Sequence, residues 1–208
     1  MTKQNNYMAG TDREQYIVKR SIECFAKHGF DVSTRELAKN IGVTQPLIYR
    51  YFGSKEQLIQ KVYDDVFYSR WDLEWESILS DKEYSMEDRL VRYLTMYTKA
   101  ILRNDWIRLF IFSALSNPKL CKDYTDLLKS RIFLPVLTEI RAEHELFDVP
   151  DDIELELIWG FHSSFFYMGV RRWVYMMDIP NNIDEIIKAK VQHFLHGYHH
   201  YLENNAHE

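Results

Sequence analysis

The stretch from residue 36 to residue 52, ELAKNIGVTQPLIYRYF, constrains the fold more than any other part of the chain. Two short amphipathic segments flank Gly42, which can adopt the positive φ that a tight turn requires. Thr44 can cap the second segment, and Pro46 is tolerated in its first turn, where the missing N–H has no helical partner. The pattern therefore predicts two short helices joined by a turn.

Capping signals divide the rest of the N-terminal quarter. Thr11, Ser33 and Ser54 each stand three residues before a glutamate or glutamine, which is the arrangement of a capping box. The first box opens a predicted helix that ends at Gly29, and the second opens the short pair. The third opens a predicted helix that runs to about Trp75.

Apolar residues recur at three- and four-residue spacing along almost the whole chain, and strand signals are weak. The fold class is therefore predicted to be all-α, with about nine helices. Beyond residue 79 the expected helices span residues 85–103, 106–116, 119–143, 151–177 and 183–203. Pro135 lies inside one of them and predicts a kink or break there.

Composition narrows the class of protein. The 208 residues are 46% hydrophobic and 15% aromatic, which is enough for a packed core. Cys24 and Cys121 are far apart and no CxxC is present, so the pattern indicates a reducing cytoplasm rather than a disulfide framework. The longest uncharged run in the aromatic-rich part, residues 157–170, falls short of the roughly 20 residues of a membrane span. We expect a cytoplasmic protein without a membrane partner.

Charge is distributed unevenly. Residues 1–61 carry a net charge of +4 and the remainder carries −9, although the whole chain is at −5. Salt screens exposed charges beyond about 8 to 10 Å, so the basic first quarter can bind a polyanion despite the acidic average.

The two short helices leave a polar and aromatic face that a core does not need. Its members are Thr34, Arg35, Thr44, Gln45, Leu47, Tyr49, Arg50 and Tyr51. A DNA major groove can use such hydrogen-bonding, cationic and flat side chains, so the pair is predicted to be a helix-turn-helix. The alternative is a purely structural bundle in which Tyr49 and Tyr51 are half-buried aromatic residues.

The segment GFDVSTRELAKNIGVTQPLIYRYFGSKEQL resembles the DNA-binding domain of the tetracycline-repressor family. The resemblance covers about residues 12–62 and is carried by Gly29-Phe30, TRELA, the spacing from GV to Tyr49, and the Ser-Lys at residue 54. It implies a helix-turn-helix DNA-binding domain at residues 1–62 and a ligand-binding and dimerisation domain at residues 63–208. It also implies a homodimeric regulator, commonly a repressor, that a small, largely apolar or aromatic ligand releases from a palindromic operator.

The family's roles can be carried over by position. Arg35 and Gln45 would contact base edges, and Pro46 and Tyr49 would lie against thymine methyl groups or sugar. Leu47 and Arg50 share this face without an assigned base. The expected phosphate contacts are Thr34, Thr44, Tyr51 and Lys55.

The resemblance also implies an aromatic-lined ligand cavity and a dimer formed by the last two helices. The candidate ligand contacts are Trp71, Trp75, Tyr93, Tyr97, Trp106, Phe110, His162 and Phe166. The candidate interface residues are Gly160, Ser164, Met168, Val191, Phe194, Leu195 and Tyr198. The alternative for each interface residue is a place in the core of the single chain. Nothing matches the tetracycline–magnesium site of the family, so no metal or cofactor is expected and the effector is unknown.

Two other functions stay open at this point. His193, His196 and His200 recur at helical spacing near Glu203 and could chelate zinc, although such a stripe is more typical of an interface or a solvated surface. A DNA-binding regulator without a small-molecule effector would have the same sequence signals, and a closed core would favour it. The motifs of common enzyme classes, such as GxSxG, HExxH and a Gly-rich phosphate loop, are absent, so no enzyme activity is expected.

Overall fold

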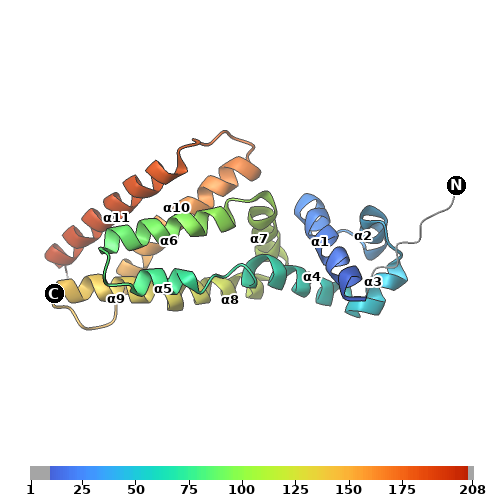
Figure 1. Cartoon of the computed structure of the whole chain (residues 1–208), viewed down its shortest axis with the longest axis horizontal. Coiled ribbons are helices and arrows are strands. Elements are labelled where there is room, and N and C mark those ends of the chain that lie inside the picture. Colours follow the sequence, from blue (N-terminus) through green and yellow to red (C-terminus); the bar gives the residue numbers. More distant parts are fainter. Residues whose placement is uncertain (1–9, 206–208) are drawn as a thin grey trace.

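The computed structural model describes residues 10–205, and every regular element in that range is a helix (Figure 1). This confirms the all-α prediction. One end of the molecule, called the head below, consists of α1 (Gly10–His28), α2 (Thr34–Ile41) and α3 (Gln45–Phe52). Helix α4 (Lys55–Tyr63) leads from the head into the rest of the chain, called the body.

The body is an elongated bundle. It consists of α5 (Glu74–Ser80), α6 (Met86–Ile101), α7 (Asn104–Ser116), α8 (Pro118–Leu128), α9 (Leu134–Glu143), α10 (Asp152–Trp173) and α11 (Ile183–Asn205). Helices α5 and α11 both pack against α6, and α10 packs against α7 and α11. Figure 1 shows α7 at the end of the bundle that meets the head, where it packs against α1.

Side-chain caps fix the starts of several helices as the sequence predicts. The Ser33 hydroxyl accepts a hydrogen bond from the Glu36 N–H at 3.2 Å, and the Ser54 hydroxyl accepts one from the Gln57 N–H at 3.1 Å. Each bond satisfies one of the free N–H groups in a first helical turn. The expected cap at Thr11 lies outside the side chains that the structure describes.

The predicted single helix from Ser54 to about Trp75 is divided in the structure. After α4, a π-helical turn at Asp64–Tyr68 and a short irregular segment precede α5. Distant contacts hold this arrangement: the Tyr63 hydroxyl donates to the Leu120 carbonyl, and Arg70 pairs with Asp105 at 3.1 Å. The prediction of one continuous helix is therefore wrong, because partners far along the chain decide the local geometry.

The helix expected over residues 119–143 is interrupted near Pro135 by a π-helical turn, which is wider than an α-helical one. A π-helical turn at Lys129–Phe133 joins α8 to α9, and Pro135 occupies the first turn of α9. Proline cannot donate to a carbonyl four residues earlier, and its ring collides with that carbonyl in a regular α-helix. A π-turn is a known way to absorb such a disruption within a continuing helix.

The buried apolar side chains form one continuous cluster from Ile17 in α1 to Leu202 in α11. Gly29 lies at a close approach between head and body, since a Cβ placed there would be 3.4 Å from the Phe112 ring. Cys24 and Cys121 are buried and are not joined by a disulfide. The head therefore packs directly on the body, and a change in one can affect the other.

Candidate nucleic-acid interface

A tight turn sets the relative position of α2 and α3. Gly42 adopts a φ of 75°, in the left-handed region that glycine enters without strain. The Val43 N–H then bonds to the Ala38 carbonyl at 3.0 Å and closes the end of α2. From α1, the Tyr16 hydroxyl donates to the Ile41 carbonyl at 3.2 Å. The end of α2 is thus fixed both locally and from α1.

The apolar faces of the two short helices are buried as the sequence predicts. These residues are Leu37, Ala38 and Ile41 from α2 and Ile48 and Phe52 from α3. Burying both faces against α1 and α4 leaves the opposite face of α3 on the surface of the head.

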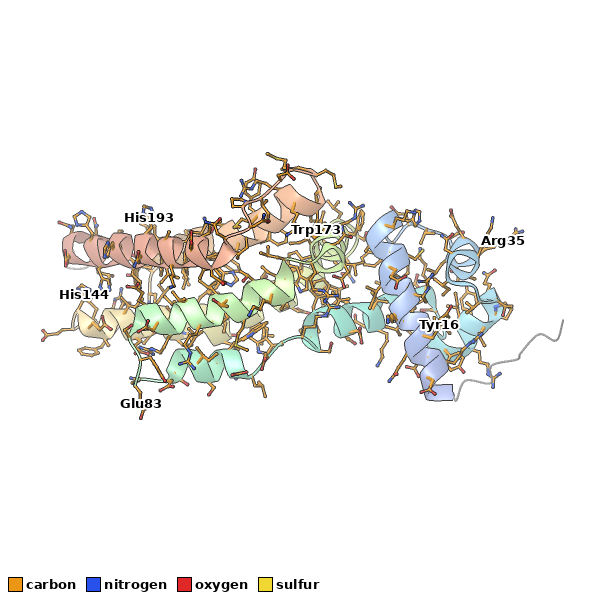
Figure 2. The ribbon with its side chains drawn as sticks, turned by 45° about the horizontal axis from the view of Figure 1, so that its top comes forward. Tyr16, Arg35, Glu83, His144, Trp173 and His193 are labelled. Atoms are coloured by element: carbon orange, nitrogen blue, oxygen red, sulfur yellow. The ribbon has the colours of Figure 1, made fainter. Side chains whose placement is uncertain are left out.

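Most of the predicted DNA contacts lie on this outer face. Arg35, Thr44, Pro46, Tyr49 and Arg50 are exposed, and Gln45, Leu47, Tyr51 and Lys55 are half-buried. Figure 2 shows Arg35 at the end of the molecule farthest from the body, extending outward. The structure therefore gathers cationic, hydroxyl, amide and aromatic groups on one surface.

Thr34 differs from the others because it is 9% exposed. Its hydroxyl oxygen accepts a hydrogen bond from the Tyr49 hydroxyl at 3.4 Å, which links α2 to α3. Hydrogen bonding to Thr34, and secondly to Gln45, lowers the pKa of Tyr49. Thr34 thus orients Tyr49 in the free protein, and its expected phosphate contact stays a prediction.

The start of α4 contains a group that the sequence analysis missed. The Glu56 carboxylate has a lowered pKa because it interacts with its own backbone N–H and with the Ser54 hydroxyl. Carboxylates are favoured in a first helical turn, so the position of Glu56 directly after Ser54-Lys55 was a usable signal. Glu56 places this negative charge next to Lys55, the expected phosphate contact.

Comparison with known proteins agrees with this geometry. Residues 17–62 match the model of the bacterial regulatory proteins, tetR family. This part of the chain, the head and α4, is therefore similar to that family. The matched residues run from the middle of α1 to the end of α4, so they contain the whole helix-turn-helix.

Relatives of this chain are known from sequence and from structure. The HTH-type transcriptional regulator YdgC of Bacillus subtilis (strain 168) is 34% identical over 86 residues, which are 41% of this chain and 44% of YdgC. The chain thus matches less than half the length of this curated relative.

Two solved structures share the fold over nearly the whole chain. A TetR-like transcriptional regulator from Rhodococcus sp. RHA1 has a TM-score of 0.68 at 16% identity, and the match covers 91% of this chain and 99% of that one. A TetR family transcriptional regulator from Pseudomonas syringae pv. tomato str. DC3000 has a TM-score of 0.63 at 16% identity, covering 91% and 97%. The body of this chain therefore has the fold of these structures, although little of their sequence.

The candidate ligand contacts of the body form a packed aromatic cluster. Trp75 lies 5.3 Å from Tyr97 between ring centroids, and Trp106 stacks on Phe110 at 5.1 Å. Trp71, Phe110 and Phe166 are half-buried, and the other candidates in the cluster are buried. The structure thus brings the predicted residues together, but their rings fill the space between them by mutual contact.

His162 lies inside this cluster. Its Nε2 is 3.0 Å from the Tyr93 hydroxyl, and its ring centroid is 4.6 Å from that of Tyr97. Burial lowers the pKa of His162 to about 3, so the imidazole is neutral at physiological pH. Burial also raises the pKa values of Tyr93 and Tyr97, and both keep their hydroxyl protons.

The candidate interface residues fall into two groups. Met168, Val191, Phe194, Leu195 and Tyr198 are buried within the single chain. These five side chains belong to the core of the protomer, which is the alternative that the sequence left open. Gly160 is exposed and Ser164 is half-buried, and the dimer contacts of the whole set stay a prediction.

The C-terminal histidines do not form a metal centre within the described chain. His193, His196 and His200 are exposed on α11, and Figure 2 shows His193 pointing outward from the body. Among residues 10–205, no three His, Cys, Asp or Glu side chains are grouped so that they could hold a metal ion. Within the same range, none of the helices combines the length and the apolar character that a membrane crossing requires.

Proposed function

We propose that this protein is a homodimeric DNA-binding transcriptional regulator of the TetR family that recognises a palindromic operator. The observation that carries the proposal is the outer face of α2 and α3, where Arg35, Thr44, Tyr49 and Arg50 are exposed together. A major groove admits a helix whose side chains present hydrogen-bonding groups to base edges. The net charge of +4 on residues 1–61 supports association with a polyanion.

Within this proposal, two side chains read base edges. Arg35 suits a guanine, and Gln45 suits an adenine, since each can form two parallel hydrogen bonds. Pro46 and Tyr49 lie against thymine methyl groups or sugar. Lys55, Thr44 and Tyr51 hold phosphates, and the Thr44 side chain makes no capping bond that would compete for it.

Dimerisation is proposed because a palindromic site requires two heads. Dimeric helix-turn-helix proteins place their recognition helices about 34 to 36 Å apart, or at a multiple of that spacing. Helix α10 offers a suitable face: Ile153, Leu157, Gly160, Ser164 and Tyr167 recur at heptad-like spacing and are exposed or half-buried. Three of them are large apolar residues that the single chain leaves uncovered.

The proposed mode of action is repression that a small, largely apolar or aromatic effector relieves. The aromatic cluster around Tyr97 supports a ligand site only if its rings move apart, because they contact one another in the present state. A regulator without a small-molecule effector is the second candidate, and the closed packing of these rings favours it. In both cases the partner is chromosomal DNA, so the proposed location is the cytoplasm and no enzyme activity is involved.

Selection from a randomised duplex library tests the proposed contacts. Arg35→Ala and Gln45→Ala should each lose about 1 to 3 kcal/mol and relax preference at one base pair of the half-site. Lys55→Ala should weaken all sequences alike and reduce the salt slope by about one, because it removes a phosphate contact. Lys119, exposed at the start of α8, provides the control variant Lys119→Ala.

The two classes of variant separate the assigned roles. If Arg35→Ala and Gln45→Ala leave the selected sequence unchanged, the base-reading assignment is wrong. If Lys119→Ala weakens binding as much as Lys55→Ala, the interface does not lie on the head.

A further inference from the structure

A cavity of about 1260 Å³ lies at the junction of head and body, away from the aromatic cluster. The head contributes one face of α1 to its wall. The body contributes the ends of α6 and α10, the start of α7 and parts of the α4–α5 segment. None of the eight residues expected to contact a ligand lines this cavity.

The two sides of the cavity are joined by one guanidinium group. Arg108 of α7 donates to the carbonyls of Ala26 and Lys27 at the end of α1. It also donates to the Trp173 carbonyl at the end of α10, at 3.4 Å. Arg108, Ala26, Lys27 and Trp173 all line the cavity, so a molecule inside it would touch the link between head and body.

The cavity wall has an excess of positive charge. Its cationic residues are Lys19, Lys27, Lys61, Arg70, Arg103 and Arg108, and its acidic residues are Glu14, Glu23, Asp65 and Asp105. Asp105 is already paired with both Arg70 and Arg103, and Glu23 is paired with Arg20. The bonds of Arg108 go to neutral carbonyls, and no carboxylate in the described part of the chain pairs with it.

A buried donor of Arg70 has no partner among residues 10–205. Arg70 Nη2 bonds to Asp105 at 3.1 Å, but within that range its buried Nη1 makes no hydrogen bond. A buried donor that has lost water and gained no acceptor is unfavourable, and an anionic acceptor satisfies it best.

Apolar side chains line another part of the same cavity. Val18, Ile22 and Ala26 lie along one stripe of α1, at spacings of four residues, and Leu102, Trp173 and Met176 face them from the body. A purely ionic ligand would leave this surface unused.

We propose that the junction cavity binds a small soluble amphipathic anion, with one carboxylate, sulfonate or phosphate head and a compact apolar part. The head group lies in the field of Arg70, Arg103 and Arg108, where a rotation of the Arg70 guanidinium would bring its buried Nη1 to the anion, and the apolar part packs against α1 and Met176. Because α1 belongs to the head and Arg108 to the body, occupancy biases their relative position. This site goes beyond the proposed function and does not depend on DNA binding.

Anilinonaphthalene sulfonate is a suitable probe, because it has a sulfonate head on an apolar ring system and fluoresces when it leaves water. N-phenylnaphthylamine has the same rings without the sulfonate. On the full chain, the sulfonate should saturate at one molecule per chain and bind about tenfold more tightly than the neutral amine, which is the ratio expected for one charge-assisted contact. Inorganic phosphate should displace it poorly, since it lacks the apolar part.

Two variants and a matched control test the location. Arg70→Gln removes the charge but keeps an N–H donor for the Asp105 carboxylate, so it should weaken the sulfonate about tenfold and leave the neutral amine unchanged. Met176→Asp places a negative charge at the cavity, where it repels the sulfonate. Met177→Asp is its control, because Met177 does not line the cavity. Both methionines are exposed, at 78% and 51%, so the chain should fold in both variants. Met176 has a φ of 56°, which aspartate tolerates.

The proposal holds if Arg70→Gln and Met176→Asp weaken the sulfonate and Met177→Asp does not. It is overturned if the neutral amine binds as tightly as the sulfonate, if Met176→Asp and Met177→Asp have equal effects, or if neither Arg70→Gln nor Met176→Asp changes the affinity. Because the readout is dye binding, failure of the proposed DNA contacts would leave this test unaffected.

Discussion

At the scale of single residues, His162 should make folding stability depend on pH. Its pKa is about 3 in the folded chain because of burial, against about 6.5 for an ordinary histidine. Between these values the unfolded chain binds more protons, so stability is lost as the pH falls below about 6.5. When the pH falls from about 7.5 to about 5, His162 should lower the free energy of unfolding by about 2 kcal/mol. Urea unfolding at both pH values measures this difference.

The variant His162→Gln isolates this contribution. Glutamine can still bond to Tyr93 but does not titrate, so the variant should lose about 2 kcal/mol less than the wild type over the same pH interval. Asp105 and Glu139 have lowered pKa values, so their protonation also reduces the free energy of unfolding on acidification. This reduction is the same in both proteins and cancels in the comparison. His193→Gln on the exposed face of α11 should behave as wild type. Equal pH dependence of wild type and His162→Gln would show that His162 is not buried as described.

The sequence predicts which chemical groups a residue exposes better than it predicts which other residues that residue contacts. The exposed chemistry of Arg35 and Arg50 follows from their place opposite the apolar face of a short helix. The bond between Thr34 and Tyr49 joins two helices across a turn, and no local pattern encodes it. The same holds for the contact of His162 with Tyr93, since these residues are 69 positions apart.

At the scale of elements, the α2–α3 turn should depend on the backbone of Gly42. A Cβ at this position would meet only the Tyr16 hydroxyl, at 4.0 Å, so space does not limit substitution. The backbone conformation limits substitution instead, because φ is 75° and an L side chain in the left-handed region costs about 1 to 2 kcal/mol. Gly42→Ala should therefore destabilise the chain by about that amount in urea unfolding.

Gly42→Asn is the matched variant, since asparagine enters the left-handed region more readily than alanine. It should lose clearly less stability than Gly42→Ala. If alanine and asparagine are equally harmful, steric contact rather than backbone conformation decides at this turn.

Sequence predicted the elements whose signals are local and missed the break that comes from distant partners. Ser33, Gly42 and Ser54 mark the ends of α2 and the start of α4 within a few residues. The break before α5 depends instead on Arg70 and its pairing with Asp105, 35 positions away. One local signal was present, because the Asp72 carboxylate accepts from the Glu74 N–H at 2.9 Å at the start of α5.

At the scale of the whole molecule, a sequence cannot tell which apolar face of a helix serves the chain's own core. Phe194 and Leu195 have the composition of an interface, yet α6 and α10 cover them in the single chain. The periodicity of α10 is apolar on more than one side, and only the fold shows that Leu157 and Tyr167 are left exposed.

Dimerisation can be tested at Gly160, in the middle of the exposed α10 face. A Cβ added there meets no atom of residues 10–205 within 4 Å, and arginine favours a helix over glycine by up to about 1 kcal/mol. Gly160→Arg should therefore leave the fold of each protomer intact while it blocks close approach of a second α10. Light scattering after size exclusion should show a shift from dimer to monomer, and affinity for a palindrome should fall toward that for a half-site.

Leu73→Arg, at an exposed position before α5, serves as the control and should stay dimeric. If Gly160→Arg remains a dimer with unchanged affinity, the two heads are joined by another surface, because an arginine at this position cannot be accommodated between closely packed helices.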